Sequence, residues 1–139
     1  MGCDIHGVVE QKIGGKWVGL GVFGERSYRM FARMAGVRNR DDVEFIPPRG
    51  YPEDMSDLAH YVMDYWDDDG HSRSWLSGTK MFGILKEVEG DTHSYEWSDT
   101  WLTSHGRVHG SYWSYKNDKL WEADDPRPED LRFVFCFDN

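Results

Sequence analysis

The start of the chain alternates apolar and polar side chains with the period of two that is typical of β-strands. Residues 3–6 show this alternation, residues 3–12 as a whole predict a strand and residues 17–23 the returning strand, and Gly14 and Gly15 stand between them, where a tight turn is needed. The sequence therefore predicts an antiparallel hairpin. Because side chains on a strand alternate between its two faces, Asp4 and His6 should stand on the same face.

Apolar residues follow with helical spacing in three places. Residues 27–35 and 79–89 place apolar side chains three and four positions apart, which predicts amphipathic helices, and Gly36 marks the end of the first. Another helix is expected over residues 56–66. Its predicted buried stripe consists of Leu58, Tyr61, Val62 and Tyr65.

The C-terminal half of the chain completes the evidence for the predicted fold class. Residues 131–137 are almost entirely apolar, which is typical of a strand buried on both faces. Residues 90–125 contain four tryptophans among glycines and serines and indicate a variable strand-and-loop insertion. We expect one compact α+β domain over residues 1–139, with about three helices. Its sheet should be mainly antiparallel or mixed, with the N- and C-terminal strands central.

Composition and charge limit the classes of partner that the protein is expected to bind. The 139 residues carry a formal charge of −9, which argues against long nucleic acid, because binding a phosphate backbone needs an extended basic surface. No apolar run approaches the roughly 18 residues of a membrane span, so no membrane partner is expected. Cys3 and Cys136 lie in apolar runs, which fits buried, reduced thiols of a cytoplasmic protein.

Charged residues are unevenly distributed. Residues 24–50 hold six arginines and no lysine, whereas residues 51–70 hold seven acidic residues and no lysine or arginine. Arginine forks onto phosphate or carboxylate and stacks on flat rings, so the first segment could bind an anionic ligand. The candidate ligand-binding arginines are Arg26, Arg29, Arg33 and Arg38. The alternative is that the two segments pair with each other across the surface.

Four motifs span the chain: M-G-C-D-I-H at its start, R-S-Y-R-M-F-A-R-M-A-G-V-R from residue 26, H-S-R-S-W-L from residue 71 and V-F-C-F-D-N at its end. Together they resemble a family of small phage-encoded proteins. The resemblance leaves residues 90–125 uncovered and implies a setting, the cytoplasm of an infected bacterium, without an activity. It implies that the polar motif residues are site residues: Asp4, His6, His71, Ser74, Asp138 and Asn139.

These polar residues could act together. If the first and last strands are neighbours, Asp4 and His6 approach Asp138, and a loop carrying Asp69 and His71 can close over the same edge. Such a group could bind a divalent metal ion through Asp4, His6 and Asp69, or work without metal through His6 and His71 as general acid and base. In the structural alternative, His6 simply bonds to Asp138 and ties the strands together.

Three functions fit these observations. The leading hypothesis is hydrolysis of a nucleotide-like phosphodiester, such as a cyclic nucleotide of bacterial defence, with arginines on phosphate and a ring such as Trp75 against the base. Ser74 and Asn139 would complete the ligand contacts. The second hypothesis is a protein that sequesters the same ligand intact, as a homo-oligomer. The third is an acidic inhibitor that binds a basic host protein.

Overall fold

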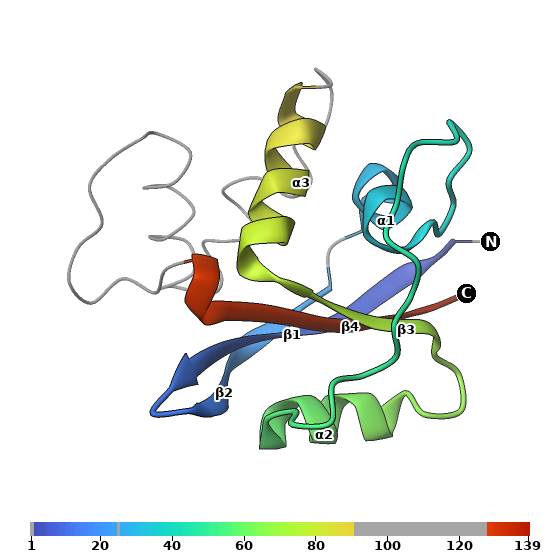
Figure 1. Ribbon diagram of the computed structural model, residues 1–139. Coiled ribbons are helices and arrows are strands. Elements are labelled where there is room, and N and C mark those ends of the chain that lie inside the picture. Colours follow the sequence, from blue (N-terminus) through green and yellow to red (C-terminus); the bar gives the residue numbers. More distant parts are fainter. Residues whose placement is uncertain (1, 25, 91–127) are drawn as a thin grey trace.

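Four antiparallel strands form the sheet at the centre of the computed structural model, which describes residues 2–24, 26–90 and 128–139 (Figure 1). The strands are β1 (Asp4–Ile13), β2 (Lys16–Phe23), β3 (His71–Ser77) and β4 (Leu131–Asp138). Their order is β2-β1-β4-β3, so the first and last strands are central, as the sequence predicts. The expected insertion over residues 90–125 lies, beyond residue 90, outside the described residues.

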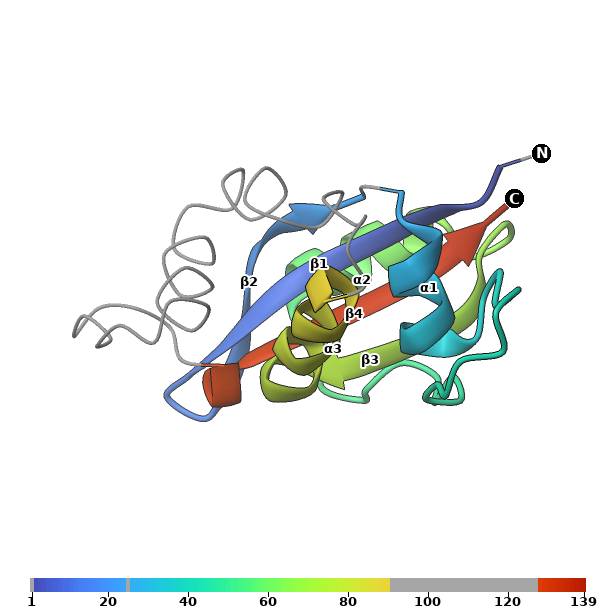
Figure 2. The ribbon, with the colours of Figure 1, turned by 90° about the horizontal axis from the view of Figure 1, so that it is seen from above.

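Helices cover both faces of this sheet. Helices α1 (Tyr28–Ala35) and α3 (Gly78–Gly90) lie on one face, and α2 (Asp57–Tyr65) lies on the other (Figures 1 and 2). The chain is therefore a single α+β domain with three layers, which confirms the predicted fold class. Among the described residues, none of the helices has the length and apolar character needed to cross a membrane.

Local sequence signals set the helix ends. The Ser27 side chain accepts a hydrogen bond from the backbone N–H of Met30 at 3.4 Å, and Gly36 ends α1 in the left-handed conformation that glycine adopts without strain. Ser56 caps α2 in the same way, accepting from the backbone N–H of Ala59 at 3.2 Å. The predicted helix boundaries are accordingly correct to within one residue at these ends.

Side chains of strand β4 pack into two separate hydrophobic cores. Its three phenylalanines, Phe133, Phe135 and Phe137, face α1 and α3, where they join the larger core. Val134 and Cys136 point to the other face and pack in a smaller core with α2. All five side chains are fully buried, which explains why the sequence of this strand is nearly free of polar residues.

The predicted buried stripe of α2 is wrong in two positions. Tyr61 and Tyr65 are each 76% exposed, and Ala59 and Met63 are the buried residues instead. Close packing of the helix on the sheet requires small or flexible side chains at the contact. Gly19 of β2 shows how close that packing is, because a Cβ placed there would lie 2.6 Å from Leu58 Cβ.

A second correction concerns His71, which was expected on a loop. It begins β3, an edge strand that pairs with β4. The pairing is irregular between His71 and Ser74, where Ser72 has a positive φ of 53°. This irregularity hides the strand from a search for alternating side chains.

Candidate functional site

The end of the sheet brings together most of the polar residues expected to act there. Asp4 is directly opposite Asp138 in the pairing of β1 with β4, and His6 is opposite Cys136. His6 Nε2 lies 2.7 Å from Asp138 Oδ1, and both side chains are about three-quarters buried, with 20% and 27% of their surfaces exposed. A carboxylate can only accept a hydrogen bond, so it fixes the proton on Nε2 and leaves Nδ1 as the basic nitrogen of His6.

The His6 ring has a second neighbour that the sequence did not indicate. It stacks on the indole of Trp66, at the end of α2, with ring centroids 3.6 Å apart and an interplanar angle of 14°. A hollow of about 320 Å³ opens beside this pair. It is lined by His6, Gly7, Val22, Phe23, Gly24, Val62 and Trp66.

His71 belongs to a different face of the sheet. It is paired with Phe137, whose ring packs on Phe31 of α1 with centroids 5.0 Å apart, whereas His6 is paired with Cys136 on the α2 face. His71 Nε2 lies 2.5 Å from Asn139 Oδ1, and its Nδ1 lies 3.0 Å from the Ser72 hydroxyl. The sheet therefore separates the two imidazoles that the sequence placed in one site.

Asp4 is engaged by an arginine. Both Nε and Nη2 of Arg26 donate to Asp4 Oδ1, at 3.0 and 2.6 Å. The hydrogen bond to Asp4 raises the pKa of the Arg26 guanidinium above its ordinary value. Each of these side chains is 49% exposed, so the pair lies at the surface beside the strand ends.

The three side chains expected to bind a metal ion, those of Asp4, His6 and Asp69, are not grouped in one site. The part of the chain that the structure describes contains no group of three or more His, Cys, Asp and Glu side chains placed to hold a metal ion. Asp4 pairs with Arg26 and His6 with Asp138, while Asp69 is an exposed residue of the turn before β3. The interpretation of Asp4, His6 and Asp69 as metal ligands is therefore not supported by the geometry.

Ser74 and Trp75 make internal contacts that anchor the proline-rich loop. The Ser74 hydroxyl, which is fully buried, accepts a hydrogen bond from the backbone N–H of Arg49 at 3.1 Å. The Arg49 guanidinium lies over the Trp75 ring, 3.8 Å from its centroid, and donates to the Trp75 carbonyl. These contacts cover the outer edge of β3, and burial lowers the pKa of Arg49.

Three of the predicted ligand-binding arginines line one hollow, which we call the arginine pocket. Arg29, Arg33 and Arg38 contribute to it together with Arg40, and Tyr28 supplies an aromatic ring. Its volume is about 150 Å³, and its other lining residues are Ala32, Asn39, Asp41 and Val43. The sequence predicted the arginine cluster but not the turn after α1 that folds Arg38 and Arg40 back toward the helix.

The turn that completes the arginine pocket is fixed by its own hydrogen bonds. The Asn39 side chain donates to the Val43 carbonyl and accepts from the Val43 N–H, both at 2.9 Å. Arg38 has a positive φ of 55°, a conformation that costs a non-glycine residue about 1–2 kcal/mol. Such strain at a polar residue in a hollow is typical of functional positions.

Arg38 also connects the arginine pocket to the strand ends. Its guanidinium lies 5.5 Å from the centre of the Tyr28 ring, and the Tyr28 hydroxyl accepts a hydrogen bond from the Cys3 N–H at 3.0 Å. Burial raises the pKa of the Cys3 thiol, and Arg38 acts in the opposite direction. The arginine pocket and the Asp4–Asp138 strand pair are therefore neighbours.

A buried ion-pair network lies on the α2 face, and no pattern in the sequence predicts it. Arg132 Nε donates to Glu10 Oε1 at 2.6 Å, and its Nη1 donates to Asp54 Oδ1 at 2.7 Å. The other oxygen of Glu10 accepts from the Ser56 N–H at 2.6 Å, at the start of α2. Glu10 is fully buried, so the network joins the sheet to α2 in the interior.

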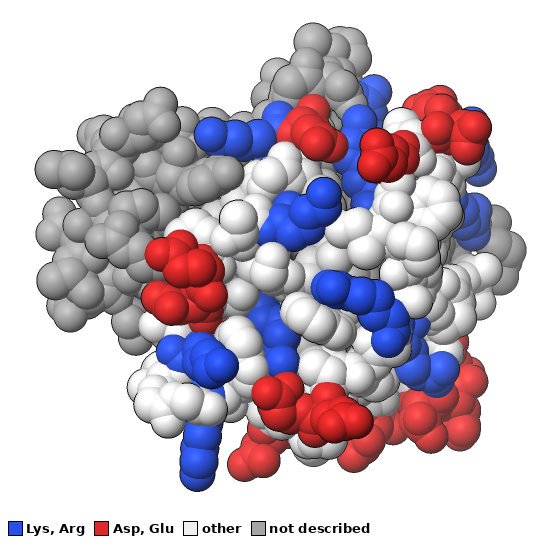
Figure 3. Space-filling model, viewed as in Figure 1, with Lys and Arg blue, Asp and Glu red and all other residues white. Residues whose placement is uncertain are grey.

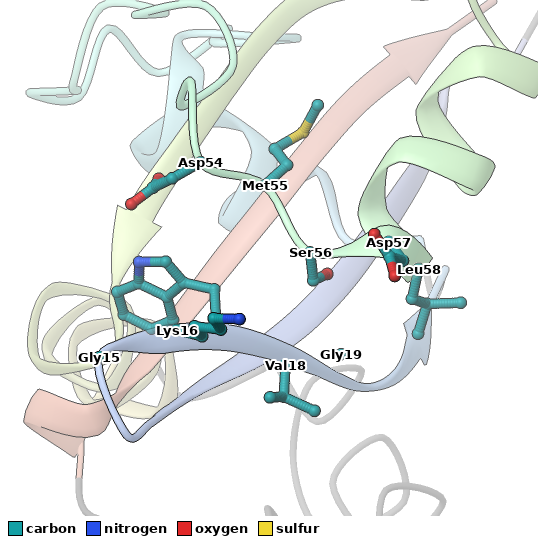
Figure 4. Close-up of a pocket in the computed structure, with 10 residues that line it drawn as sticks. Gly15, Lys16, Val18, Gly19, Asp54, Met55, Ser56, Asp57 and Leu58 are labelled. Carbon is teal, nitrogen blue, oxygen red and sulfur yellow. The ribbon is translucent and has the colours of Figure 1, made fainter.

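An open groove runs beside this network, between β2 and the start of α2 (Figure 4). We call it the hairpin groove, and its volume is about 620 Å³. Figure 4 shows residues 54–58 along one side and the backbone of β2 along the other. Lys16, Trp17 and Val18 line the β2 side.

Comparisons with protein-family models, curated protein sequences and solved structures give no match to this chain. The functional conclusion accordingly rests on the geometry of the strand ends and of the arginine pocket.

Proposed function

We propose that this protein binds a small, phosphate-bearing, nucleotide-like ligand through the arginine pocket. The supporting observation is that four arginines, Arg29, Arg33, Arg38 and Arg40, line one hollow in a chain whose formal charge is −9. Arginine pairs with phosphate oxygens through two parallel hydrogen bonds, and the pocket is preorganised by the Asn39 turn.

The size of the arginine pocket limits what enters it. Sites that enclose a whole drug-sized ligand measure about 300–1,000 Å³, whereas this one measures about 150 Å³. A single phosphate group fits, and the remainder of the ligand lies outside, on the side of Arg40, the exposed arginine among the four. The resemblance to small phage-encoded proteins adds the class of ligand that we propose, the small nucleotide signals of bacterial defence.

The geometry favours holding the ligand over cleaving it. Hydrolysis of a phosphodiester without metal usually needs one group to remove a proton from the nucleophile and another to protonate the leaving oxygen. His6 and His71 would have supplied these groups, but they lie on opposite faces of the sheet. Sequestration is therefore our first candidate.

Hydrolysis remains a second candidate because of the His6–Asp138 pair. An imidazole whose Nε2 is held 2.7 Å from a carboxylate is oriented to accept a proton at Nδ1, and the carboxylate stabilises the imidazolium that forms. Exposed Asp4 and Arg26 lie close by at the same strand ends. In this candidate His6 is the general base and Asp138 orients it.

The test is binding of cyclic and linear nucleotides by calorimetry, with chromatography of the ligand before and after heating. We expect saturable binding to the wild type and at least a tenfold loss in Arg38→Gly, which removes the guanidinium and suits the positive φ of residue 38. Lys80→Ala, an exposed change outside the arginine pocket, is the matched control and should bind normally.

The chromatogram separates the two candidates. Sequestration predicts that the ligand returns intact after denaturation. Hydrolysis predicts a new product that His6→Ala abolishes while binding persists. Equal binding by the wild type and Arg38→Gly would rule out the arginine pocket as the binding site.

A further inference from the structure

The outer side of α2 holds two tyrosines in solvent. Tyr61 and Tyr65 are one helical turn apart and each is 76% exposed. With Asp57 and Asp64 they form a stripe at helical spacing, which we call the tyrosine face of α2. The helix is held on the sheet from its opposite side, so these two rings contribute little to the core.

Acidic residues near this face are placed against the helix dipole. Asp64 lies in the last turn of α2, and residues 67–69, all aspartates, follow directly, with no basic residue in that turn. The C-terminal end of a helix carries partial negative charge, so these carboxylates weaken the helix instead of stabilising it. Figure 3 shows acidic side chains gathered along the lower edge of the molecule, over α2.

We propose that the tyrosine face of α2 docks a basic segment of another protein, one in which lysines or arginines alternate with apolar side chains. Guanidinium and ammonium groups stack on tyrosine rings and pair with carboxylates, and tyrosine is enriched at the energetic centres of interfaces. Residues 51–70 carry seven acidic side chains and no lysine or arginine, so their field attracts a basic chain and repels a nucleic acid.

The hairpin groove extends this surface at the start of α2. It shares Asp57 with the tyrosine face and adds the apolar side chains of Trp17, Met55 and Leu58 (Figure 4). An apolar side chain of the docked segment fits there, while Asp57 lies at the edge for a neighbouring basic residue; Asp54 is already paired with Arg132. The surface thus offers both contacts that the proposed partner sequence requires.

The test uses amide NMR titrations with three short peptides: one alternating arginine and leucine, one alternating glutamate and leucine, and one alternating arginine and serine. We expect the first to saturate, with shifts confined to residues 54–69 and the hairpin, and the third to bind at least tenfold more weakly. The acidic peptide should cause no shifts. Binding should weaken as salt is added, because exposed charges are screened.

Two variants and one control locate the binding. Tyr61→Ala with Tyr65→Ala, and Asp64→Lys with Asp68→Lys, should each weaken the arginine–leucine peptide at least tenfold while the melting temperature stays within about 3 °C of the wild type. Glu129→Lys reverses an exposed charge away from α2 and should leave binding unchanged.

Three results would overturn the proposal: shifts that spread over the molecule without saturating, binding that survives both variants, or no binding at all. If the wild type alone forms dimers that the tyrosine variant abolishes, a second copy of this chain is the occupant and the foreign basic partner is excluded. None of these changes touches the arginine pocket, so nucleotide binding succeeds or fails independently.

Discussion

At the residue scale, the most deeply buried ion pair among the described residues joins Glu10 to Arg132. Both are almost completely buried, with 0% and 5% of their side chains exposed, and their atoms approach to 2.6 Å. Asp54, the other partner of Arg132, is 69% exposed, and its hydrogen bond with Arg132 lowers its pKa. The same arginine thus has one partner in the interior and one at the surface.

These two partners should differ in their effect on stability. Glu10→Gln leaves a buried guanidinium without its charge partner, and we expect the free energy of unfolding to fall by about 3–5 kcal/mol. Asp54→Asn removes a solvated carboxylate from the same guanidinium and should cost at most about 1 kcal/mol. Urea denaturation of both variants measures the difference. Equal losses would mean that Arg132 does not depend on its interior partner.

At the scale of elements, two glycines differ in the space around them: Gly19 lies under α2, and Gly83 lies within α3. A Cβ on Gly19 of β2 would lie 2.6 Å from Leu58 Cβ, so α2 can sit at its observed height only over a glycine. Among the residues that the structure describes, none has an atom within 4 Å of a Cβ added to Gly83 in α3. The first glycine is required by packing, whereas the second is only a weak point in a helix.

The two glycines therefore predict opposite outcomes for the same substitution. Gly19→Ala forces α2 away from the sheet and should destabilise the protein by about 1–3 kcal/mol. Gly83→Ala fills open space in a helix and should stabilise it by about 0.5–1 kcal/mol. Thermal or chemical denaturation of both variants provides the check. Destabilisation by Gly83→Ala would show that α3 packs more tightly than its open surroundings indicate.

At the scale of the whole molecule, the edge strands and the helices pack around the central pair of strands, β1 and β4. β4 pairs with β1 and with β3, and its side chains enter both cores. α2 is attached to the sheet through buried Ala59 and Met63, partly buried Leu58 and Val62, and the Glu10–Ser56 hydrogen bond, and its other side is exposed. Such an arrangement predicts a hierarchy of local stability.

Hydrogen exchange should reveal this hierarchy. We expect the amides of Val8 and Val134 to exchange only through global unfolding, with the same free energy that denaturation measures. Amides in the middle of α2 should exchange through local opening, at a lower free energy. If α2 amides were protected as strongly as those of β4, the helix would be part of the cooperative core.

Short-range sequence patterns predicted most of the secondary structure, because the side chains that determine it are neighbours in the sequence. The hairpin, α1 and α3 follow from alternating or helical spacing, from Gly14 and Gly15, and from the Ser27 and Gly36 caps. The uninterrupted apolar run of β4 also indicated its central position. These features depend on backbone geometry and solvent exclusion, which a local sequence expresses directly.

The tertiary structure alone decided which residues meet. Register placed His6 beside Asp138, as the sequence suggested, but put His71 on the other face, because a pairing shifted by one residue turns a side chain over. α2 buries Ala59 and Met63 against the sheet and packs Leu58 over Gly19, and this orientation exposes Tyr61 and Tyr65. The Glu10–Arg132 pair spans 122 residues, so its attraction exists only once the two central strands are joined.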